Sequence, residues 1–124
     1  SDENIYLENE NPKFSLISPN NLLDISTINA LLKVYVNANV MDRAMLFFKT
    51  IQIRFKDVIP NKQTYRIIWT GLVKARMYDE AKYIFNLRKE NNIHCSPYLY
   101  RDLVHLASAH KDPDGCAYYL NEMD

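Results

Sequence analysis

Glycine and cysteine are scarce in this sequence, which has two of each among its 124 residues. Hairpins between strands use glycine for positive backbone dihedrals, so its scarcity favours helices over a sheet. Two cysteines are too few for a disulfide framework, and their small number agrees with a reducing compartment. No uncharged apolar stretch approaches the roughly 18 residues that cross a bilayer, so we expect no membrane span.

Neither sign of charge dominates the chain as a whole, because 15 basic residues balance 15 acidic ones. The balance is uneven along the chain. Five acidic residues and one basic residue up to Asp24 give a net charge of −4, whereas 14 basic and 10 acidic residues from Ile25 onward give +4. The acidic beginning lacks the apolar core of a secretory signal and the arginine-rich character of a transit peptide. We interpret residues 1–24 as an acidic segment that is irregular or that ends a preceding repeat.

An internal repeat is the strongest signal in the remainder of the chain. Three series of residues share one pair of intervals, 37 and then 35 positions, and this agreement predicts repeats over residues 25–61, 62–96 and 97–124, the last of them incomplete. The three series are Ile28, Tyr65 and Tyr100; Ala44, Ala81 and Cys116; and Phe48, Phe85 and Leu120.

Each repeat has the pattern of two helices. In the first repeat, apolar residues from Ile28 to Tyr35 follow helical spacing, and we expect Ser26 or Thr27 to cap the start of that helix. Asp112, which precedes a proline, is expected to cap the last helix of the chain. One helical pair cannot bury its own apolar face, so neighbouring pairs must share the burial. The predicted fold class is therefore all-α, an α-solenoid of helix-turn-helix repeats.

The large aromatic side chains are assigned to the core of these repeats, because burying each of them stabilises the fold by roughly 1.5 to 3 kcal/mol. A role in holding a cofactor is far less frequent for aromatic residues at such spacing, and we expect no cofactor. The residues assigned to the core in this way are Phe48, Tyr65, Trp69 and Phe85.

The second repeat carries a resemblance to a known family. Its sequence TYRIIWTGLVKARMYDEAKYIF, from Thr64 to Phe85, resembles the pentatricopeptide repeat consensus in residue type and order. The first repeat has the same frame, and Pro60-Asn61 closes it as this family often does. The resemblance extends from Ile25 to Met123 and is weakest in the third repeat.

Tetratricopeptide repeats are the competing family, because they also pair helices and have a period of about 34 residues. They usually carry a small residue, most often glycine, at a position where this sequence has bulky side chains. The longer period also favours the pentatricopeptide family. The three bulky residues at that position are Leu32, Trp69 and Val104.

Pentatricopeptide proteins bind single-stranded RNA and read about one base per repeat with side chains of the first helix and of the repeat end. The resemblance implies that the pair Asn29 and Asn61 reads one base and, as such pairs do in this family, prefers pyrimidines. An amide can both donate to and accept from the edge of a base. Arg66, paired with Ser96, and Arg101 take the same positions. The two arginines depart from the family's usual small polar choice, so those repeats could hold phosphate or protein instead of reading a base.

Positions next to the base-reading residues are also implied in RNA binding. Gln63 and Tyr98, like Ser26, fall where the family places a wedge between bases, and only Tyr98 is suited to stacking. Asp24 matches the repeat-end position of a preceding repeat.

The charge pattern supports an anionic partner independently of the family. The expected first helices, residues 25–37, 62–76 and 97–111, hold seven basic residues, Lys33 and Lys74 among them, against Asp102 alone, a net charge of +6. If these helices line one surface, that surface attracts a phosphate backbone. The alternative is that these charges simply face water.

Catalysis is not expected of this segment, because its acidic residues are scattered over solvent-facing helix positions and no glycine loop is present to hold phosphate. Metal binding is not expected either, because no histidine or cysteine pair has the spacing of metal ligands. The residues considered as metal ligands were His94, Cys95, His105, His110 and Cys116.

The resemblance implies a place in the mitochondrial matrix and a role in the processing, stability or translation of organellar RNA. The alternative is a scaffold for protein docking, such as an extension of a larger mitochondrial RNA polymerase or of a ribosome-associated protein. In that case the partners would be other proteins of a mitochondrial gene-expression complex.

Overall fold

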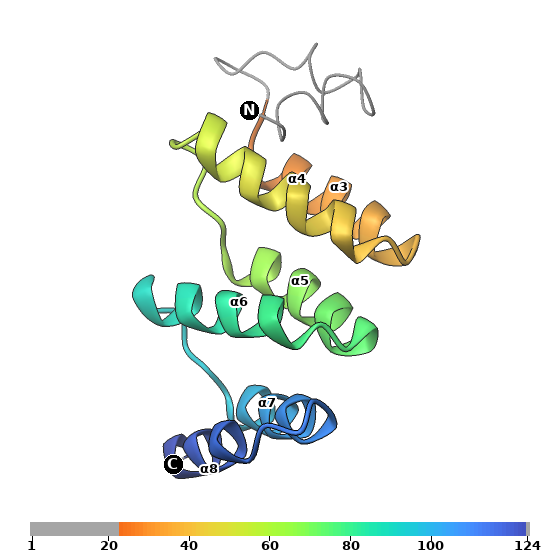
Figure 1. Cartoon of the computed structure of the whole chain (residues 1–124). Coiled ribbons are helices and arrows are strands. Elements are labelled where there is room, and N and C mark those ends of the chain that lie inside the picture. The colour runs from red at the N-terminus through yellow and green to blue at the C-terminus, as the bar shows by residue number, and fades with distance from the viewer. Residues whose placement is uncertain (1–22, 124) are drawn as a thin grey trace. The chain divides into compact units, whose positions relative to one another are not determined.

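The structure is a computed structural model, and it describes residues 23–123. Six helices and no strand are found in this part of the chain, so the predicted all-α class is confirmed (Figure 1). The chain divides into two compact units: unit 1, which ends at Ile68, and unit 2, which begins at Trp69. The acidic segment expected over residues 1–24 lies outside the described residues except for its last two. No helix within residues 23–123 is both long and apolar enough to cross a bilayer.

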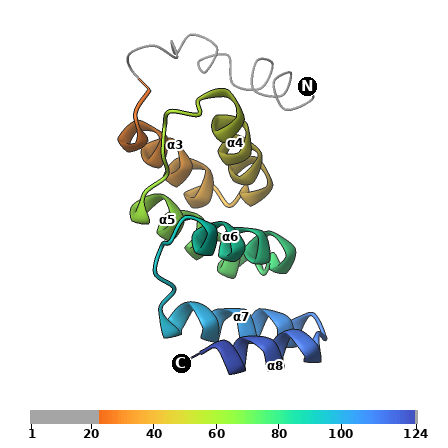
Figure 2. The ribbon, with the colours of Figure 1, turned by 90° about the vertical axis from the view of Figure 1, so that its left-hand side faces the viewer.

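Unit 1 contains α3 (Ile25–Asn37), α4 (Met41–Arg54) and the first half of α5 (Lys62–Ala75). Helices α3 and α4 run antiparallel and lie side by side (Figures 1 and 2). Aromatic rings join these elements: the centroids of Tyr35 and Phe47 are 5.6 Å apart, and those of Phe48 and Tyr65 are 6.3 Å apart. The apolar faces predicted from helical spacing therefore form the core of this unit.

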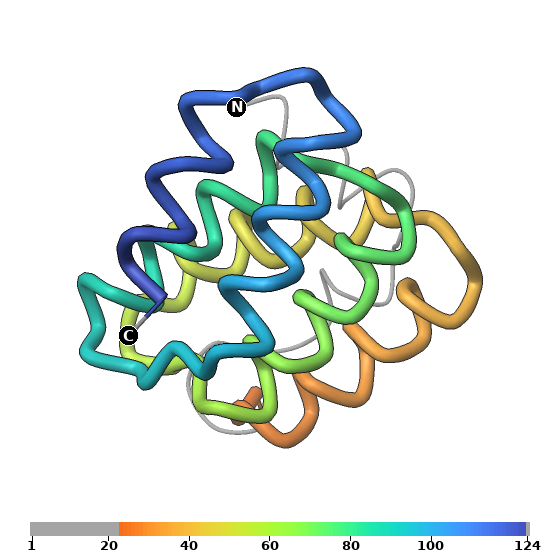
Figure 3. Tube along the Cα trace, turned by 90° about the horizontal axis from the view of Figure 1, so that it is seen from below, coloured from red at the N-terminus to blue at the C-terminus, as the bar shows by residue number. Residues whose placement is uncertain are grey.

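Unit 2 contains the second half of α5, α6 (Tyr78–Glu90), α7 (Pro97–Ala109) and α8 (Pro113–Glu122). Helices α7 and α8 form a second antiparallel pair (Figure 3), and α6 packs against α7. The ring of Phe85 on α6 meets Tyr100 of α7 and Tyr119 of α8 edge-on, with centroids 5.5 and 5.6 Å away. The Phe85 ring thus packs between α7 and α8 in the core of the unit.

The aromatic residues assigned to the core from the sequence are all buried, which confirms that assignment. Phe48 and Phe85 each meet a tyrosine of the next first helix, Tyr65 and Tyr100 respectively. Leu120, the third member of their series, differs, because 57% of its surface is exposed. It lies on α8, and no later helix of the described residues covers it.

The helix starts confirm one expected cap and contradict another. Asp112 caps α8 as predicted, with its Oδ1 accepting a hydrogen bond from the backbone N–H of Gly115 at 3.0 Å. The prediction that Ser26 or Thr27 caps α3 is wrong, because the N-cap is Asp24, whose Oδ1 accepts from the N–H of Thr27 at 2.8 Å. Helix α3 begins at Ile25, and a capping side chain must precede the first helical residue to reach the free N–H groups.

Four helices end without the glycine that usually follows a helix. One or two positions past each end, a residue has a φ of 57° to 61°, in the left-handed region where side chains are strained. The same two backbone bonds recur at these ends; after α3, for example, the N–H of Val40 bonds the carbonyl of Tyr35. Scarcity of glycine therefore did not prevent tight helix connections. The four residues are Asn39, Arg76, Asn92 and Lys111.

Candidate functional site

Unit 1 has a cavity of about 440 Å³ between residues of α3 and residues at the start of α5. Four of the residues that the sequence analysis assigned to RNA binding line it, namely Asn29, Lys33, Asn61 and Gln63. Lys33 is the one charged side chain in the lining, so the cavity has a positive wall and no carboxylate. The other lining residues are Ile25, Ser26, Ala30 and Ile67.

A network of three polar side chains, here called the Asn–Thr cluster, lies at this cavity and consists of Asn29, Asn61 and Thr64. Asn29 Nδ2 donates to Asn61 Oδ1 at 3.2 Å, and Thr64 Oγ1 donates to Asn29 Oδ1 at 2.6 Å. Asn29 and Asn61, predicted to act as a pair from positions 32 residues apart, are therefore hydrogen-bonded to each other. Their action on RNA stays a prediction.

The start of α5 explains why the Asn–Thr cluster forms. Asn61 precedes this helix, and its Oδ1 accepts from the backbone N–H of Thr64 at 3.0 Å. Thr64 Oγ1 in turn accepts from the N–H of Asn61 at 3.1 Å, which completes a reciprocal capping box. The capping bonds between Asn61 and Thr64 thus fix the position from which the Thr64 hydroxyl reaches Asn29 of α3.

Burial differs within the Asn–Thr cluster and decides what a ligand could reach. Thr64 is fully buried and Asn29 is 8% exposed, whereas Asn61 is exposed. The Oδ1 atom of Asn61 already accepts from Thr64 and Asn29, and no described residue accepts from its Nδ2. The cavity is therefore edged by amide N–H groups, which can donate to acceptor atoms on a planar ligand.

Tyr98 and Arg101 form a second candidate group, on α7 in unit 2. Tyr98 is 68% exposed, and the guanidinium carbon of Arg101 lies 5.1 Å from the centroid of its ring. Arg101 also comes within 3.9 Å of Asp102, an ion pair too long and too exposed to hold it firmly. An exposed ring with a cation above it is the kind of surface on which a base stacks.

The remaining predicted residues lie on α5 and at the start of α7. Arg66 is exposed on α5, Lys74 is exposed in the last turn of the same helix, and Ser96 is the N-cap residue of α7 with no capping bond from its side chain. Arg66 belongs to unit 1 and Ser96 to unit 2. Their pairing stays a prediction.

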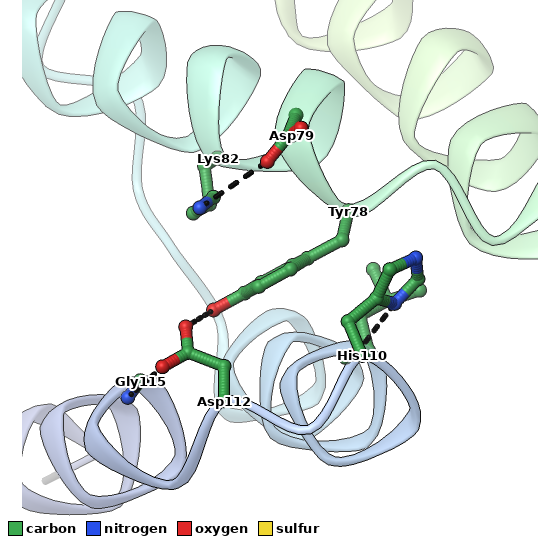
Figure 4. Close-up of polar contacts among 7 residues, drawn as sticks. Tyr78, Asp79, Lys82, His110, Asp112 and Gly115 are labelled. Atoms are coloured by element: carbon green, nitrogen blue, oxygen red, sulfur yellow. Dashed lines mark hydrogen bonds and ion pairs between the residues drawn. The ribbon is translucent and has the colours of Figure 1, made fainter.

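Two carboxylates of unit 2 hold hydrogen bonds that the sequence analysis missed. Trp69 Nε1 donates to Asp102 Oδ2 at 3.0 Å, and the Tyr78 hydroxyl donates to Asp112 Oδ2 at 2.7 Å (Figure 4). The expectation that acidic residues simply face solvent is wrong for these two. A signal was present, because the partners are 33 and 34 positions apart, about one repeat.

The bond between Tyr78 and Asp112 perturbs both groups. The hydrogen bond from the Tyr78 hydroxyl, together with the one from the N–H of Gly115, holds the pKa of Asp112 below its usual value. Burial, reinforced by the same carboxylate, raises the pKa of Tyr78 well above the ordinary value for a tyrosine. At neutral pH the pair is a phenol donating to a carboxylate.

A smaller cavity of about 230 Å³ lies in unit 2, with Arg76, Asp102 and His105 among its lining residues. Asp102 accepts a hydrogen bond from Trp69, and the side chains of Arg76 and His105 are both exposed.

Within residues 23–123 no group of three or more histidine, cysteine, aspartate or glutamate side chains is arranged to hold a metal ion.

Comparison with known proteins adds no identification. No protein-family model matches the sequence, and a search among curated proteins finds no relative.

Proposed function

We propose that this chain is a pentatricopeptide-type α-solenoid that binds single-stranded RNA, with the cavity of unit 1 taking one base. The supporting observation is that Asn29 and Asn61, chosen from the sequence as a base-reading pair, are hydrogen-bonded at 3.2 Å and line one cavity. Two residues 32 positions apart would not be expected to form a hydrogen bond if their positions were unrelated. The proposed setting, the processing, stability or translation of mitochondrial RNA, rests on the family resemblance.

The chemistry of the cavity suits a nucleotide. Its volume of about 440 Å³ is in the range of small-molecule sites, which are typically 300 to 1,000 Å³. Amide N–H groups of Asn29 and Asn61 can donate to acceptors on the edge of a base, and Lys33 can neutralise a phosphate. In unit 2, the exposed ring of Tyr98 beneath Arg101 offers a stacking surface of the kind that single-stranded RNA uses.

Fluorescence polarisation with labelled RNAs would test the proposal. The whole chain is titrated into single-stranded RNAs made only of cytidine, uridine or adenosine, at two salt concentrations. We expect binding that weakens as salt rises, because cationic side chains displace counterions from phosphates. The double variant Asn29→Ala, Asn61→Ala should reduce the preference between RNAs more than it reduces average affinity. Asn86→Ala, at an exposed asparagine of α6, is the matched control and should change neither.

Absence of RNA binding at low salt would refute the proposal and favour a second function, a scaffold for protein docking in a mitochondrial gene-expression complex. One observation favours this alternative: α8 exposes large apolar side chains, with Tyr118 48% and Leu120 57% exposed. An equal loss of affinity for all three RNAs in the double variant would instead rule out base reading at Asn29 and Asn61.

A further inference from the structure

We infer that Thr64, which does not line the cavity, is a positioning residue that sets the orientation of the Asn29 amide and so decides which base unit 1 prefers. This inference rests on the proposed function. The family resemblance did not assign Thr64 to RNA binding, and its side chain is fully buried.

The Thr64 hydroxyl carries one hydrogen and can accept through its lone pairs. It accepts from the backbone N–H of Asn61, and its hydrogen has two acceptors within reach: Asn29 Oδ1 at 2.6 Å and Asn61 Oδ1 at 3.0 Å. The shorter contact identifies Asn29 Oδ1 as the recipient. Asn29 therefore has its oxygen held by Thr64 and its nitrogen held by Asn61.

Successive hydrogen bonds that begin at a backbone N–H allow only this orientation of the Asn29 amide. The backbone N–H of Thr64 can only donate, so the atom of Asn61 that faces it must be the oxygen. That oxygen in turn requires a donor from Asn29, which must be Nδ2. Rotating the Asn29 amide by half a turn would bring two oxygens together at 3.2 Å and set its nitrogen against a hydroxyl that already accepts from Asn61.

The orientation of the Asn29 amide depends on the Thr64 hydroxyl, because among the described residues only this hydroxyl donates to Asn29 Oδ1. Without that hydroxyl the oxygen of a nearly buried amide would lack a donor, which is a costly state. Asn29 would then rotate towards water in the cavity. The cavity would then present a carbonyl acceptor where the native protein presents an N–H donor. A base whose edge carries acceptors would therefore no longer bind more tightly than other bases.

The test compares three variants of the whole chain by the polarisation assay with cytidine, uridine and adenosine RNAs. Thr64→Val removes the hydroxyl and keeps the side-chain shape, and Thr64→Ser keeps the hydroxyl. Thr50→Val is the matched control: Thr50 is as buried as Thr64, and its hydroxyl donates at 2.7 Å to the carbonyl of Leu46, away from the amide pair. The readout is the ratio of dissociation constants between RNAs, which a loss of stability alone does not move.

We expect Thr64→Val to reduce the preference ratio by about tenfold, the effect of one well-placed pair of hydrogen bonds to a base edge. Thr64→Ser and Thr50→Val should keep the wild-type ratio. If Thr64→Val keeps that ratio while folded, or if the wild-type chain binds RNA without preference, the inference is overturned. If the wild-type chain binds no RNA, the proposed function itself fails, and this result is distinct from the other two.

A measurement on the wild-type chain covers the case in which Thr64→Val does not fold. In the nuclear magnetic resonance spectrum, one side-chain amide hydrogen of Asn29 should exchange slowly with solvent, because it is bonded to Asn61. Both side-chain amide hydrogens of Asn61 should exchange fast. Rapid exchange of both Asn29 hydrogens would show that the Asn–Thr cluster does not form in solution and would overturn the inference.

Discussion

The two units join their helices with different polar chemistry. In unit 1 the link is neutral, an amide of α3 bonded to the amide and hydroxyl that cap α5. In unit 2 the links are charged, since Trp69 and Tyr78 donate to the carboxylates of Asp102 and Asp112. A neutral link beside a lysine-edged cavity leaves room for an anionic ligand, whereas carboxylates repel one. The difference explains why the candidate base site is assigned to unit 1.

The largest effect should come from removing the aromatic centre of unit 2. Phe85→Ala deletes a ring that is 2% exposed and contacts Tyr100 and Tyr119, so we expect a loss of about 3 to 5 kcal/mol in the free energy of unfolding. Urea unfolding followed by the fluorescence of Trp69, the one tryptophan of the chain, would measure it.

Phe48→Ala makes the equivalent change in unit 1 and sharpens the comparison. It should lower the urea midpoint reported by Trp69 fluorescence less than Phe85→Ala does, because Trp69 belongs to unit 2. Equal shifts from both variants would mean that the two units unfold as one cooperative body.

Gly115→Ala should break the charged link of unit 2. A Cβ at this position would lie 2.5 Å from the Tyr78 hydroxyl oxygen and 2.9 Å from the carboxyl carbon of Asp112. We expect a net loss of about 1 kcal/mol despite the better helix propensity of alanine, because crowding costs roughly 1 to 3 kcal/mol. Thermal unfolding would measure it. In a Tyr78→Phe background the same change should cost less, because one of the two crowding groups is gone and only the Asp112 carboxylate remains. An unchanged cost there would exclude the hydroxyl as a cause.

Glycine at a left-handed helix end should stabilise the chain. Lys111→Gly relieves a φ of 58° in unit 2, and we expect a gain of about 0.5 to 1 kcal/mol in thermal unfolding experiments. Asn39→Gly, at the corresponding turn of unit 1, should gain less, because asparagine tolerates this region better than lysine does. A larger gain at Asn39 would contradict this explanation.

The smallest effect is a pH dependence that arises from the bond between Tyr78 and Asp112 in unit 2. The folded pKa of Asp112 is depressed, so its stabilising contribution is present above the pKa of the unfolded carboxyl group and is lost as the pH falls through the folded pKa. Tyr78→Phe removes the main cause of that depression. The variant should therefore be less stable than the wild type near neutral pH, with a difference that shrinks in acid.

Urea unfolding over a series of pH values would measure this difference. Asp112→Asn should abolish the same part of the acid dependence. A difference between the wild type and Tyr78→Phe that stays constant down to the lowest pH would argue against the charged link.

The helices were predictable because their signals are local. The first helices expected over 25–37, 62–76 and 97–111 differ from α3, α5 and α7 by at most two residues at an end. The cap of α3 was misassigned, since serine, threonine and aspartate are all good caps and their positions differ by only two or three residues. The burial of Leu120 was overestimated, because a repeat pattern assigns an apolar role before it is known whether a helix covers the residue.

The candidate site was only partly predictable. The family resemblance named Asn29 and Asn61, but Thr64 went unnoticed, although its place three residues after Asn61 is the spacing of a reciprocal cap. Asp102 was counted only as a charge against the basic residues of its helix. In both cases the residue acts through a partner about one repeat away, and spacing alone does not choose among the several side chains found at that distance.

The amino-acid sequence by itself determined that residues 23–123 are helical, where the first helix of each repeat lies to within two residues, and that four large aromatic side chains are buried, because these follow from periodicity and from the chemistry of neighbouring residues. Only the tertiary structure decided that Thr64 holds Asn29, that Tyr78 bonds Asp112, and that Gly115 has no room for a side chain. Such choices depend on distances of a few tenths of an ångström between elements far apart in the chain, which helical periodicity does not fix.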